Sequence, residues 1–308
     1  MLMRRRLDLL LCIGEILADM IGEEKNGITT YERKAGGAPF NVACALKKFG
    51  ADVKFVGCVG DDLIGQFLIK YAEDFGMDTT YIHKSEKHNT TLAFVELNEE
   101  GERSFCFYRK NTADYQMPAV SDELIGQADI VCIGSLMLAD ADCVEYALDI
   151  AERAHKMGKT VAFDVNYRTD IFRDTESAVK TYKKILSCAD IVKFSEDEVE
   201  IFGEDYVSSL GDKLVLITLG KKGSEWRYKG EGNSLPTIDI KPIDTTGAGD
   251  AFFAGALTVL DKNAGKPLDS EVLNASIKFG NVTGALNTIG RGAIDNLPNL
   301  DTINKYLN

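Results

Sequence analysis

Proline, tryptophan and histidine are scarce in this chain, which has 6 prolines, 1 tryptophan and 3 histidines among its 308 residues. With a hydrophobic fraction of 45%, so few prolines exclude a disordered or collagen-like polypeptide. No two of the 7 cysteines are spaced as CxxC and no two histidines as HxxxH. The sequence therefore predicts buried, reduced thiols and no zinc held by the protein.

Basic side chains are outnumbered: 35 Lys and Arg stand against 48 Asp and Glu, for a formal net charge of -13. Binding to nucleic acid or to an anionic membrane depends on clustered Lys and Arg, so we expect neither partner. A small anion such as ATP can still bind where backbone N–H groups supply a positive field. Glycine-rich loops are therefore the segments best suited to hold one.

Long apolar runs are also missing, since none approaches the ~20 residues that a membrane span needs. The N-terminus has the basic start of a signal peptide, at residues 4–6. Asp8 interrupts the apolar run that follows, and Glu15 ends it. A buried first strand is the better interpretation, and we expect a cytoplasmic protein.

Short apolar runs alternate with amphipathic stretches along most of the chain. Strands are expected at 9–16, 53–59, 130–134, 160–164, 191–194 and 213–218, and helices at 41–49, 63–75, 143–157, 178–188, 197–202, 248–260, 269–286 and 300–307. This alternation predicts an α/β fold, with a doubly wound, mostly parallel sheet flanked by helices. We interpret residues 1–308 as a single domain.

Two stretches, 27–34 and 81–108, lack helical periodicity. The second reads as a β-hairpin, with strands at 91–97 and 103–108 around a turn at 98–101. Such strands predict a small separate β-sheet, built from segments within about 18–34 and 81–114, which would act as a lid. Because exposed sheet edges invite pairing, a homodimer through the lids is expected.

The segment 244–256 has the strongest chemical signal. Gly247, Ala248 and Gly249 have little or no side chain, and an apolar helix follows them directly. Their amides and the positive end of the helix dipole suit a transferring phosphoryl group. Asp250, in the first helical turn, would accept the proton of an attacking hydroxyl. The alternative is that Asp250 only caps the helix.

Three further segments offer polar groups at the expected ends of strands. Gly36, Gly37 and Asn41 could bind a polyhydroxyl compound, or could simply begin a helix at Pro39. Asp19 lies just beyond the first strand and could accept sugar hydroxyls, or could be a solvated loop acid.

Two more loops follow strands expected later in the chain. Thr218, Gly220 and Gly223 suit a nucleotide, although a basic turn between two strands would look the same. The acidic run 195–198 could hold hydrated Mg²⁺, or could be a solvated first turn of a helix.

Taken together, these motifs resemble the ribokinase-like (PfkB-type) family of carbohydrate kinases over essentially the whole length. Segment 36–41 is similar to the N-terminal signature of that family and segment 244–250 to its C-terminal signature. Segment 59–62 with Gly65 matches a third recurring element. Two signatures about 200 residues apart and in the right order are far more specific than either alone.

The resemblance implies a role for each matching residue. Those implied in catalysis are Asp250, Gly247, Ala248, Gly249 and Arg168, and those implied in sugar binding are Asp19, Gly36, Gly37, Asn41, Phe105, Tyr108, Arg109 and Asn166. The implied ATP site comprises Thr218, Gly220, Gly223, Lys193 and Asn281, the last near the adenine pocket of the family. Glu198 would bind Mg²⁺ through water, and Asp244 and Thr246 would belong to a K⁺ loop. Ser195 stands where the family usually has Asn.

Within the family, segments 105–109 and 164–168 look like those of bacterial fructokinases. The resulting prediction is transfer of the γ-phosphate of ATP, with Mg²⁺, to the primary hydroxyl of fructose. The nearest alternative is a 2-keto-3-deoxygluconate kinase, whose substrate carboxylate Arg109 and Arg168 could bind. Another sugar or nucleoside kinase, and a catalytically idle sugar-binding regulator, also remain open.

Overall fold

The computed structural model describes residues 9–97, 103–172 and 174–307. The basic N-terminal residues 4–6 and the turn predicted at 98–101 lie outside these ranges. Within them, none of the helices is both long and apolar enough to cross a membrane.

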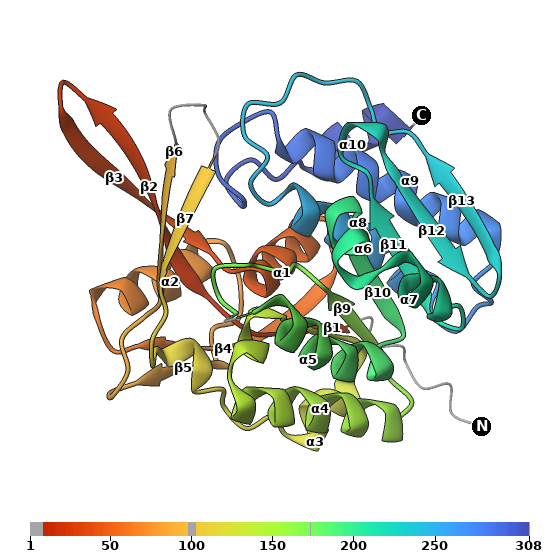
Figure 1. Cartoon of the computed structure of the whole chain (residues 1–308), viewed down its shortest axis with the longest axis horizontal. Coiled ribbons are helices and arrows are strands. Elements are labelled where there is room, and N and C mark those ends of the chain that lie inside the picture. Colours follow the sequence, from red (N-terminus) through yellow and green to blue (C-terminus); the bar gives the residue numbers. More distant parts are fainter. Residues whose placement is uncertain (1–8, 98–102, 173, 308) are drawn as a thin grey trace.

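A nine-stranded sheet forms the centre of the described chain (Figure 1). Its strands, in spatial order, are β13 (Glu231–Leu235), β12 (Ser224–Tyr228), β11 (Leu214–Thr218), β10 (Ile191–Ser195), β9 (Thr160–Asp164), β8 (Ala128–Ile133), β1 (Leu9–Ile13), β4 (Asp52–Gly60) and β5 (Ile82–Ser85). Neighbouring strands from β11 to β5 run parallel, and β12 and β13 add an antiparallel edge. The chain leaves β1 on one side for β4 and later returns on the other for β8, so the ligand crevice is expected at the carboxyl ends of β1 and β8.

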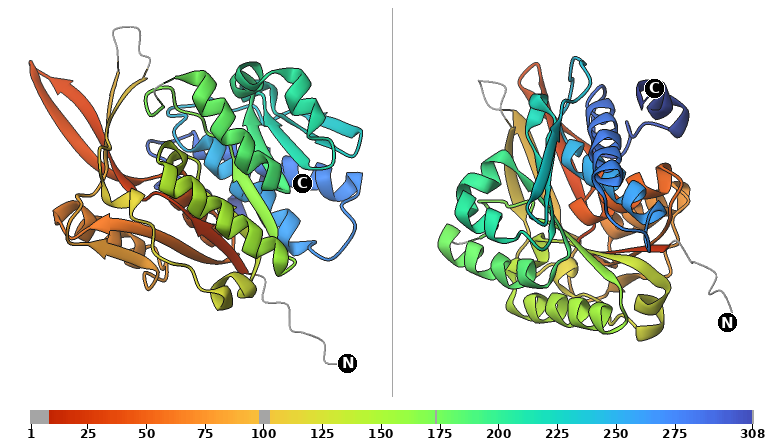
Figure 2. Two further views of the ribbon diagram at one scale, coloured as in Figure 1. Left: turned by 60° about the horizontal axis from the view of Figure 1, so that its bottom comes forward. Right: turned by 90° about the vertical axis from the view of Figure 1, so that its right-hand side faces the viewer.

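Helices cover both faces of this sheet because its strands are apolar on both sides (Figures 1 and 2). In β1, Leu10 and Cys12 join one buried cluster while Leu11 and Ile13 join the other. The first cluster includes α1 (Ala38–Lys48), α2 (Leu63–Asp74), α8 (Ala248–Lys262), α9 (Ser270–Asn287) and α10 (Leu300–Leu307). The second includes α3 (Asp122–Gln127), α4 (Ala141–Lys156), α5 (Thr175–Cys188), α6 (Glu196–Phe202) and α7 (Glu204–Ser209).

A separate four-stranded sheet projects from this body (Figure 1). It is ordered β3 (Ile28–Gly36), β2 (Leu17–Lys25), β6 (Leu92–Leu97) and β7 (Arg103–Tyr108), and is called the small sheet below. β2 pairs antiparallel with β3 and parallel with β6. β6 and β7 form the hairpin that the sequence predicts.

The predicted α/β fold with a doubly wound sheet and a small second sheet is confirmed. The strand expected at 9–16 is shorter than predicted, because Gly14, with a φ of 153°, turns the chain out of the large sheet and into the small one. Two strands at the edge, β12 and β13, were not predicted. The exposed residues of β13 have no apolar alternation to reveal them.

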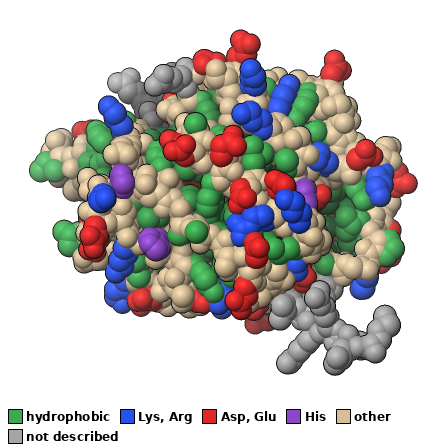
Figure 3. Space-filling model, turned by 90° about the horizontal axis from the view of Figure 1, so that it is seen from below, with side chains coloured by type: hydrophobic (Ala, Val, Ile, Leu, Met, Phe, Trp, Pro, Cys, Tyr) green, Lys and Arg blue, Asp and Glu red, His purple; other side chains and the backbone are tan. Residues whose placement is uncertain are grey.

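The surface carries both signs of charge. On the face seen in Figure 3, acidic and basic side chains are interspersed, and neither kind gathers into a continuous patch. This distribution accords with the modest excess of acidic residues in the sequence.

Candidate active site

A crevice of about 1740 Å³ lies between the carboxyl ends of the large sheet and the inner face of the small sheet. Most residues predicted for the site line it: Asp19, Gly37, Asn41, Asn166, Arg168, Lys193, Glu198, Thr218, Asp244, Thr246, Gly247, Gly249 and Asp250. Segments far apart in the sequence therefore meet in one cavity, as expected at the switch point of a doubly wound sheet.

The glycine-rich turn before α8 faces this crevice. Gly247 caps the helix in the left-handed region, with a φ of 74°. A Cβ there would lie 2.6 Å from the side chain of Ala293, so the close approach as well as the φ calls for glycine. Amides in the first turn of a helix have no acceptor within the helix, so they can bind an anion.

Asp250 stands in the first turn of α8 and is linked to the other signature segment. The Asn41 side chain donates a 2.8 Å hydrogen bond from Nδ2 to Oδ2 of Asp250. Burial raises the pKa of Asp250, against the effects of this hydrogen bond and of the nearby cations Lys193 and Arg168. A carboxylate with a raised pKa, held in place by an amide, is suited to accept a proton from a substrate hydroxyl.

A buried ion pair lies beside the turn. Lys193 Nζ, from the middle of β10, is 3.0 and 3.1 Å from the two carboxylate oxygens of Asp164, at the end of β9. A Cβ on Gly249 would lie 3.0 Å from the same Nζ, so a larger residue there would crowd the ammonium beside the anion-binding turn. Burial raises the pKa of Asp164 to about 7, partly offset by Lys193 and reinforced by Glu198 and Asp250.

Glu198 is buried and fixed by two backbone amides. Its Oε2 accepts from the Ser195 amide at 2.7 Å and its Oε1 from the Tyr167 amide at 2.6 Å. The first bond belongs to a capping box that begins α6, so Ser195 performs the capping in place of the Asn usual in the family. The second bond holds the loop that carries Asn166 and Arg168 against the crevice.

Asp244 joins two loops next to the turn. Its Oδ1 accepts from the Thr246 amide at 2.7 Å, and its Oδ2 accepts from the Gly292 amide at 3.0 Å. Asn287 also bridges the loops, donating from Nδ2 to the carbonyl oxygens of Thr246 and Ala293. The predicted K⁺ loop at Asp244 and Thr246 is thus joined to the segment that contains Gly292 and Ala293.

The small sheet supplies the opposite wall. Asp19 on β2 projects over Gly36 on β3, where a Cβ would come within 2.2 Å of its Oδ2. Phe107 on β7 also lines the crevice, a residue that the sequence did not single out. Side chains alternate between the two faces of a strand, so the pattern predicts one face for Phe105 and Phe107 and the opposite face for Tyr108. This alternation could have identified Phe107, in place of Tyr108, as the second aromatic residue of the site.

Tyr108 is a correction to the predicted sugar site. Its side chain is 63% exposed and packs against Phe94 with ring centroids 5.2 Å apart. It stands on the outer face of the small sheet, opposite to Phe107, and so does not reach the crevice. The side chain of Phe105 lies outside the described residues.

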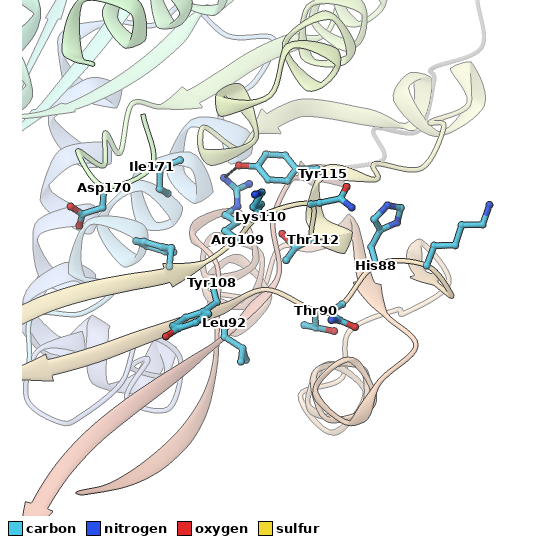
Figure 4. Close-up of a pocket in the computed structure, with 14 residues that line it drawn as sticks. His88, Thr90, Leu92, Tyr108, Arg109, Lys110, Thr112, Tyr115, Asp170 and Ile171 are labelled. Atoms are coloured by element: carbon cyan, nitrogen blue, oxygen red, sulfur yellow. Dashed lines mark hydrogen bonds between the residues drawn. The ribbon is translucent and has the colours of Figure 1, made fainter. Parts of the chain in front are cut away.

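Arg109 is likewise not among the described residues that line the crevice. It is buried at the base of the small sheet, with Nε 2.6 Å from Oδ2 of Asp114. Its Nη1 donates to the Leu136 carbonyl and to the Tyr115 hydroxyl, which Figure 4 shows beside it. A buried carboxylate therefore already neutralises the guanidinium that was expected to contact the substrate.

Other predicted residues also stand outside the crevice lining within the described chain: Gly36, Gly220, Gly223, Ala248 and Asn281. Gly223, with a φ of 110°, makes the turn into β12, where a Cβ would lie 2.0 Å from the Leu235 carbonyl. Asn281 donates to the carbonyls of Leu235 and Pro236 and so holds the same loop. Both residues therefore fix the segment at Leu235 and Pro236, behind the crevice lining.

Known proteins with similar sequences and structures are sugar kinases. The model of the pfkB family carbohydrate kinase matches residues 7–300. The chain belongs to the pfkB family of carbohydrate kinases.

Individual members of the family resemble the chain over nearly its full length. Fructokinase-1 of Zea mays is 35% identical, covering 94% of this chain and 95% of that one. The structure of a Xylella fastidiosa fructokinase with bound ATP superposes with a TM-score of 0.91 at 30% identity, covering 97% of this chain and 98% of that chain.

A fructokinase of Vibrio cholerae, solved with fructose, ADP and calcium, has a TM-score of 0.88 at 29% identity. The match covers 98% of this chain and 100% of that chain. A double mutant of the Vibrio protein contains fructose, ADP and a potassium ion. The predicted family and its resemblance to bacterial fructokinases are confirmed.

Proposed function

We propose that the protein is a fructokinase that transfers the γ-phosphate of ATP to the primary hydroxyl of fructose. The hydrogen bond between Asn41 and Asp250 carries the proposal, because it joins the sugar-side segment to the acid of the anion-binding turn. A hydroxyl bound beside Asn41 would lie next to Asp250, which would accept its proton as the oxygen attacks the phosphoryl group. Charge that develops on the phosphoryl oxygens would meet the amides of Gly247 and Gly249 and the cations Lys193 and Arg168.

Fructose is favoured over 2-keto-3-deoxygluconate by the state of Arg109. An acidic sugar needs a cation for its carboxylate. Of the two arginines named for this role, Arg109 is occupied by Asp114, and Arg168 is the cation proposed above for the transferring phosphoryl group. Fructose is neutral and needs only hydrogen-bonding groups, which Asp19, Asn41 and Asn166 offer. A catalytically idle regulator is the less favoured alternative, because it would not need Asp250 or the anion-binding turn.

Mg²⁺ and K⁺ are the metal ions proposed. Within the described ranges, no cluster of three or more His, Cys, Asp or Glu is arranged to hold a metal ion by itself. Mg²⁺ commonly binds through one or two carboxylates, water and substrate phosphates, which fits Glu198 at the crevice wall. It would neutralise phosphate charge there, and the joined loops at Asp244 and Thr246 would hold K⁺.

The small sheet is proposed to act as a lid and as a dimer contact. Its inner face lines the crevice, so closure would exclude water from the transferring phosphate. Its outer face exposes Tyr31 and Tyr108, which flank Phe94 in edge-to-face contacts. A homodimer through this aromatic face would give twice the 33.8 kDa chain mass in light scattering, and a monomeric mass would exclude it.

The cytoplasmic location stays a prediction.

The substrate assignment is tested with purified protein, ATP and Mg²⁺. The candidate substrates are fructose, 2-keto-3-deoxygluconate, ribose, adenosine and fructose phosphate, each assayed for ADP release. We expect the highest kcat/KM for fructose. A higher value for another compound would overturn the assignment within the family, and ADP release with none of them would favour the idle regulator.

A further inference from the structure

Glu15 is a buried acid for which the mechanism above has no use. It follows Gly14 at the point where the chain passes from β1 of the large sheet to β2 of the small sheet. Its side chain is fully buried, and neither carboxyl oxygen has a hydrogen-bond partner among the described residues. An unsatisfied buried polar group destabilises the fold, so this arrangement calls for a partner.

Three other buried polar atoms near Glu15 also lack a partner within the described chain. They are Oγ of Ser135, the hydroxyl of Tyr182 and Nη2 of Arg109. Glu15 Oε2 lies 3.0 Å from where a Cβ on Gly134 would be, next to Ser135. Arg109 Nη1 donates to the carbonyl of the residue after Ser135. Burial raises the pKa of Tyr182, the Ser135 hydroxyl within hydrogen-bonding reach lowers it, and Glu15 raises it.

These four side chains therefore form one enclosed cluster, which we call the hinge cluster: Glu15, Arg109, Ser135 and Tyr182. Its members come from the ends of β1, β7 and β8 and from α5. Buried groups of this kind are usually satisfied by ordered water, which makes about three hydrogen bonds at such a site. A water shared by the four would satisfy the polar atoms that these side chains leave without a well-formed hydrogen bond.

The protonation state of Glu15 suits this arrangement. Burial raises its pKa to about 8; Arg109 lowers the value, while Asp114 and Asp250 raise it. The carboxyl is therefore neutral at pH 7, and can both donate and accept a hydrogen bond. Among the groups that face it, Arg109 is held by Asp114 and the Tyr182 phenol is neutral.

The hinge cluster connects the base of the small sheet to the floor of the crevice. Arg109 directly follows β7, and its Nη1 is bound to the carbonyl of Leu136, which lines the crevice. On the other side, a Cβ on Gly37 would lie 2.5 Å from the Glu15 carbonyl oxygen, so the segment that begins α1 and carries Asn41 rests on Glu15.

We propose that Glu15 is a positioning residue for phosphoryl transfer: its neutral carboxyl, through water enclosed with Arg109, Ser135 and Tyr182, fixes the base of the small sheet against the crevice floor. Ionised Glu15 would compete with Asp114 for the Arg109 guanidinium. It would thereby shift the base of the small sheet relative to the crevice floor. The kinetic consequences rest on the proposed fructokinase reaction. The enclosed water and the pH dependence of stability do not.

The kinetic test compares wild type with Glu15→Gln, whose amide has the shape and the donor and acceptor of a neutral carboxyl. Ser276→Ala is the matched control, because Ser276 is fully buried in α9, with its hydroxyl on the Leu273 carbonyl. We expect the kcat/KM of wild type and control for fructose to fall about tenfold between pH 7 and pH 9, as one group near pH 8 ionises. Glu15→Gln should be nearly flat over this range. A variant that keeps the wild-type fall would overturn the proposal.

Two readouts do not depend on the substrate. A crystal structure should show a water within hydrogen-bond distance of Glu15 and Arg109 Nη2, and a direct contact between the two instead would overturn the enclosed-water arrangement. Because the folded pKa of Glu15 is raised above its usual 4.5, its contribution to stability is lost as pH rises from about 4.5 to about 8. The melting temperature of Glu15→Gln relative to wild type should therefore increase with pH, and a constant difference would contradict a neutral Glu15. If fructose proves not to be a substrate, these two results still decide the proposal.

Discussion

The Arg109–Asp114 and Lys193–Asp164 ion pairs are both buried, but their surroundings differ. Asp114, at the base of the small sheet, accepts hydrogen bonds from the Thr91 and Thr112 hydroxyls as well as from Arg109. Asp164, at the floor of the crevice, stands near two other acids, Glu198 and Asp250, and burial raises its pKa to about 7.

The same type of interaction therefore has two different consequences. At the small sheet, the additional hydroxyl donors stabilise the charge of Asp114 and fix the hairpin base. At the crevice, an excess of acids around one ammonium leaves a site where negative charge is costly and where an arriving phosphate must be balanced by cations. A buried pair whose carboxylate accepts from additional donors stabilises the fold, and an incompletely balanced pair next to a cavity is available for chemistry.

The largest expected effect comes from replacing Asp250, the acid next to the Lys193–Asp164 pair. Asp250→Asn should reduce kcat about 10²–10⁴-fold, because the amide cannot accept the substrate proton. Binding of ATP and fructose, measured by calorimetry, should change little. Retained kcat would show that Asp250 is not the base.

The next effect is on stability and concerns the pair at the small sheet. Asp114→Asn leaves the buried Arg109 guanidinium without its counter-charge, and should lower the free energy of unfolding by about 3–5 kcal/mol. Denaturation in urea measures this value. Asp74→Asn is the matched control, since Asp74 pairs with Lys70 on the exposed side of α2. An equally small loss for both variants would contradict a stabilising role for the Arg109 pair.

The sequence predicted the crevice floor better than the small sheet. The segments around Gly37 and Gly247 were identified because the backbone there lies so close to its neighbours that few residues other than glycine fit, and glycine is visible in the sequence. The buried strands were identified from their continuous apolar runs. In both cases the local sequence carries the physical constraint.

The small sheet and the ion pairs depend instead on contacts between distant residues. β3 is exposed along most of its length, so it has no apolar alternation to predict it. Strand alternation separates Phe107 from Tyr108, but cannot say which one faces the crevice until the sheet has been placed. Lys193 and Asp164 are 29 residues apart, and their pairing follows only from the adjacency of β9 and β10.

A smaller effect is expected from the ammonium of the crevice pair. Lys193→Met should reduce kcat about 10²-fold, because a cation next to the anion-binding turn is lost while the turn remains. It should cost less stability than Asp114→Asn, since Asp164 can take up a proton once it is alone. Lys222→Met, which breaks an exposed pair with Glu196, serves as the control. A stability loss as large as that of Asp114→Asn would mean that the two pairs are alike.

The smallest effect is the pH dependence of stability contributed by Asp164. Its folded pKa of about 7 lies above the usual 3.8, so the folded state binds more protons than the unfolded state between these values. Stability is therefore lost as pH rises from about 4 to about 7, by at most about 1.4 kcal/mol per pH unit for one proton. In Asp164→Asn this contribution is absent, so the free energy of unfolding of the variant relative to wild type should increase across the same range. Urea denaturation at pH 5, 6 and 7 measures the difference. A difference that stays constant from pH 5 to pH 7 would mean that Lys193 holds Asp164 ionised, in which case the crevice pair is as well balanced as the one at the small sheet.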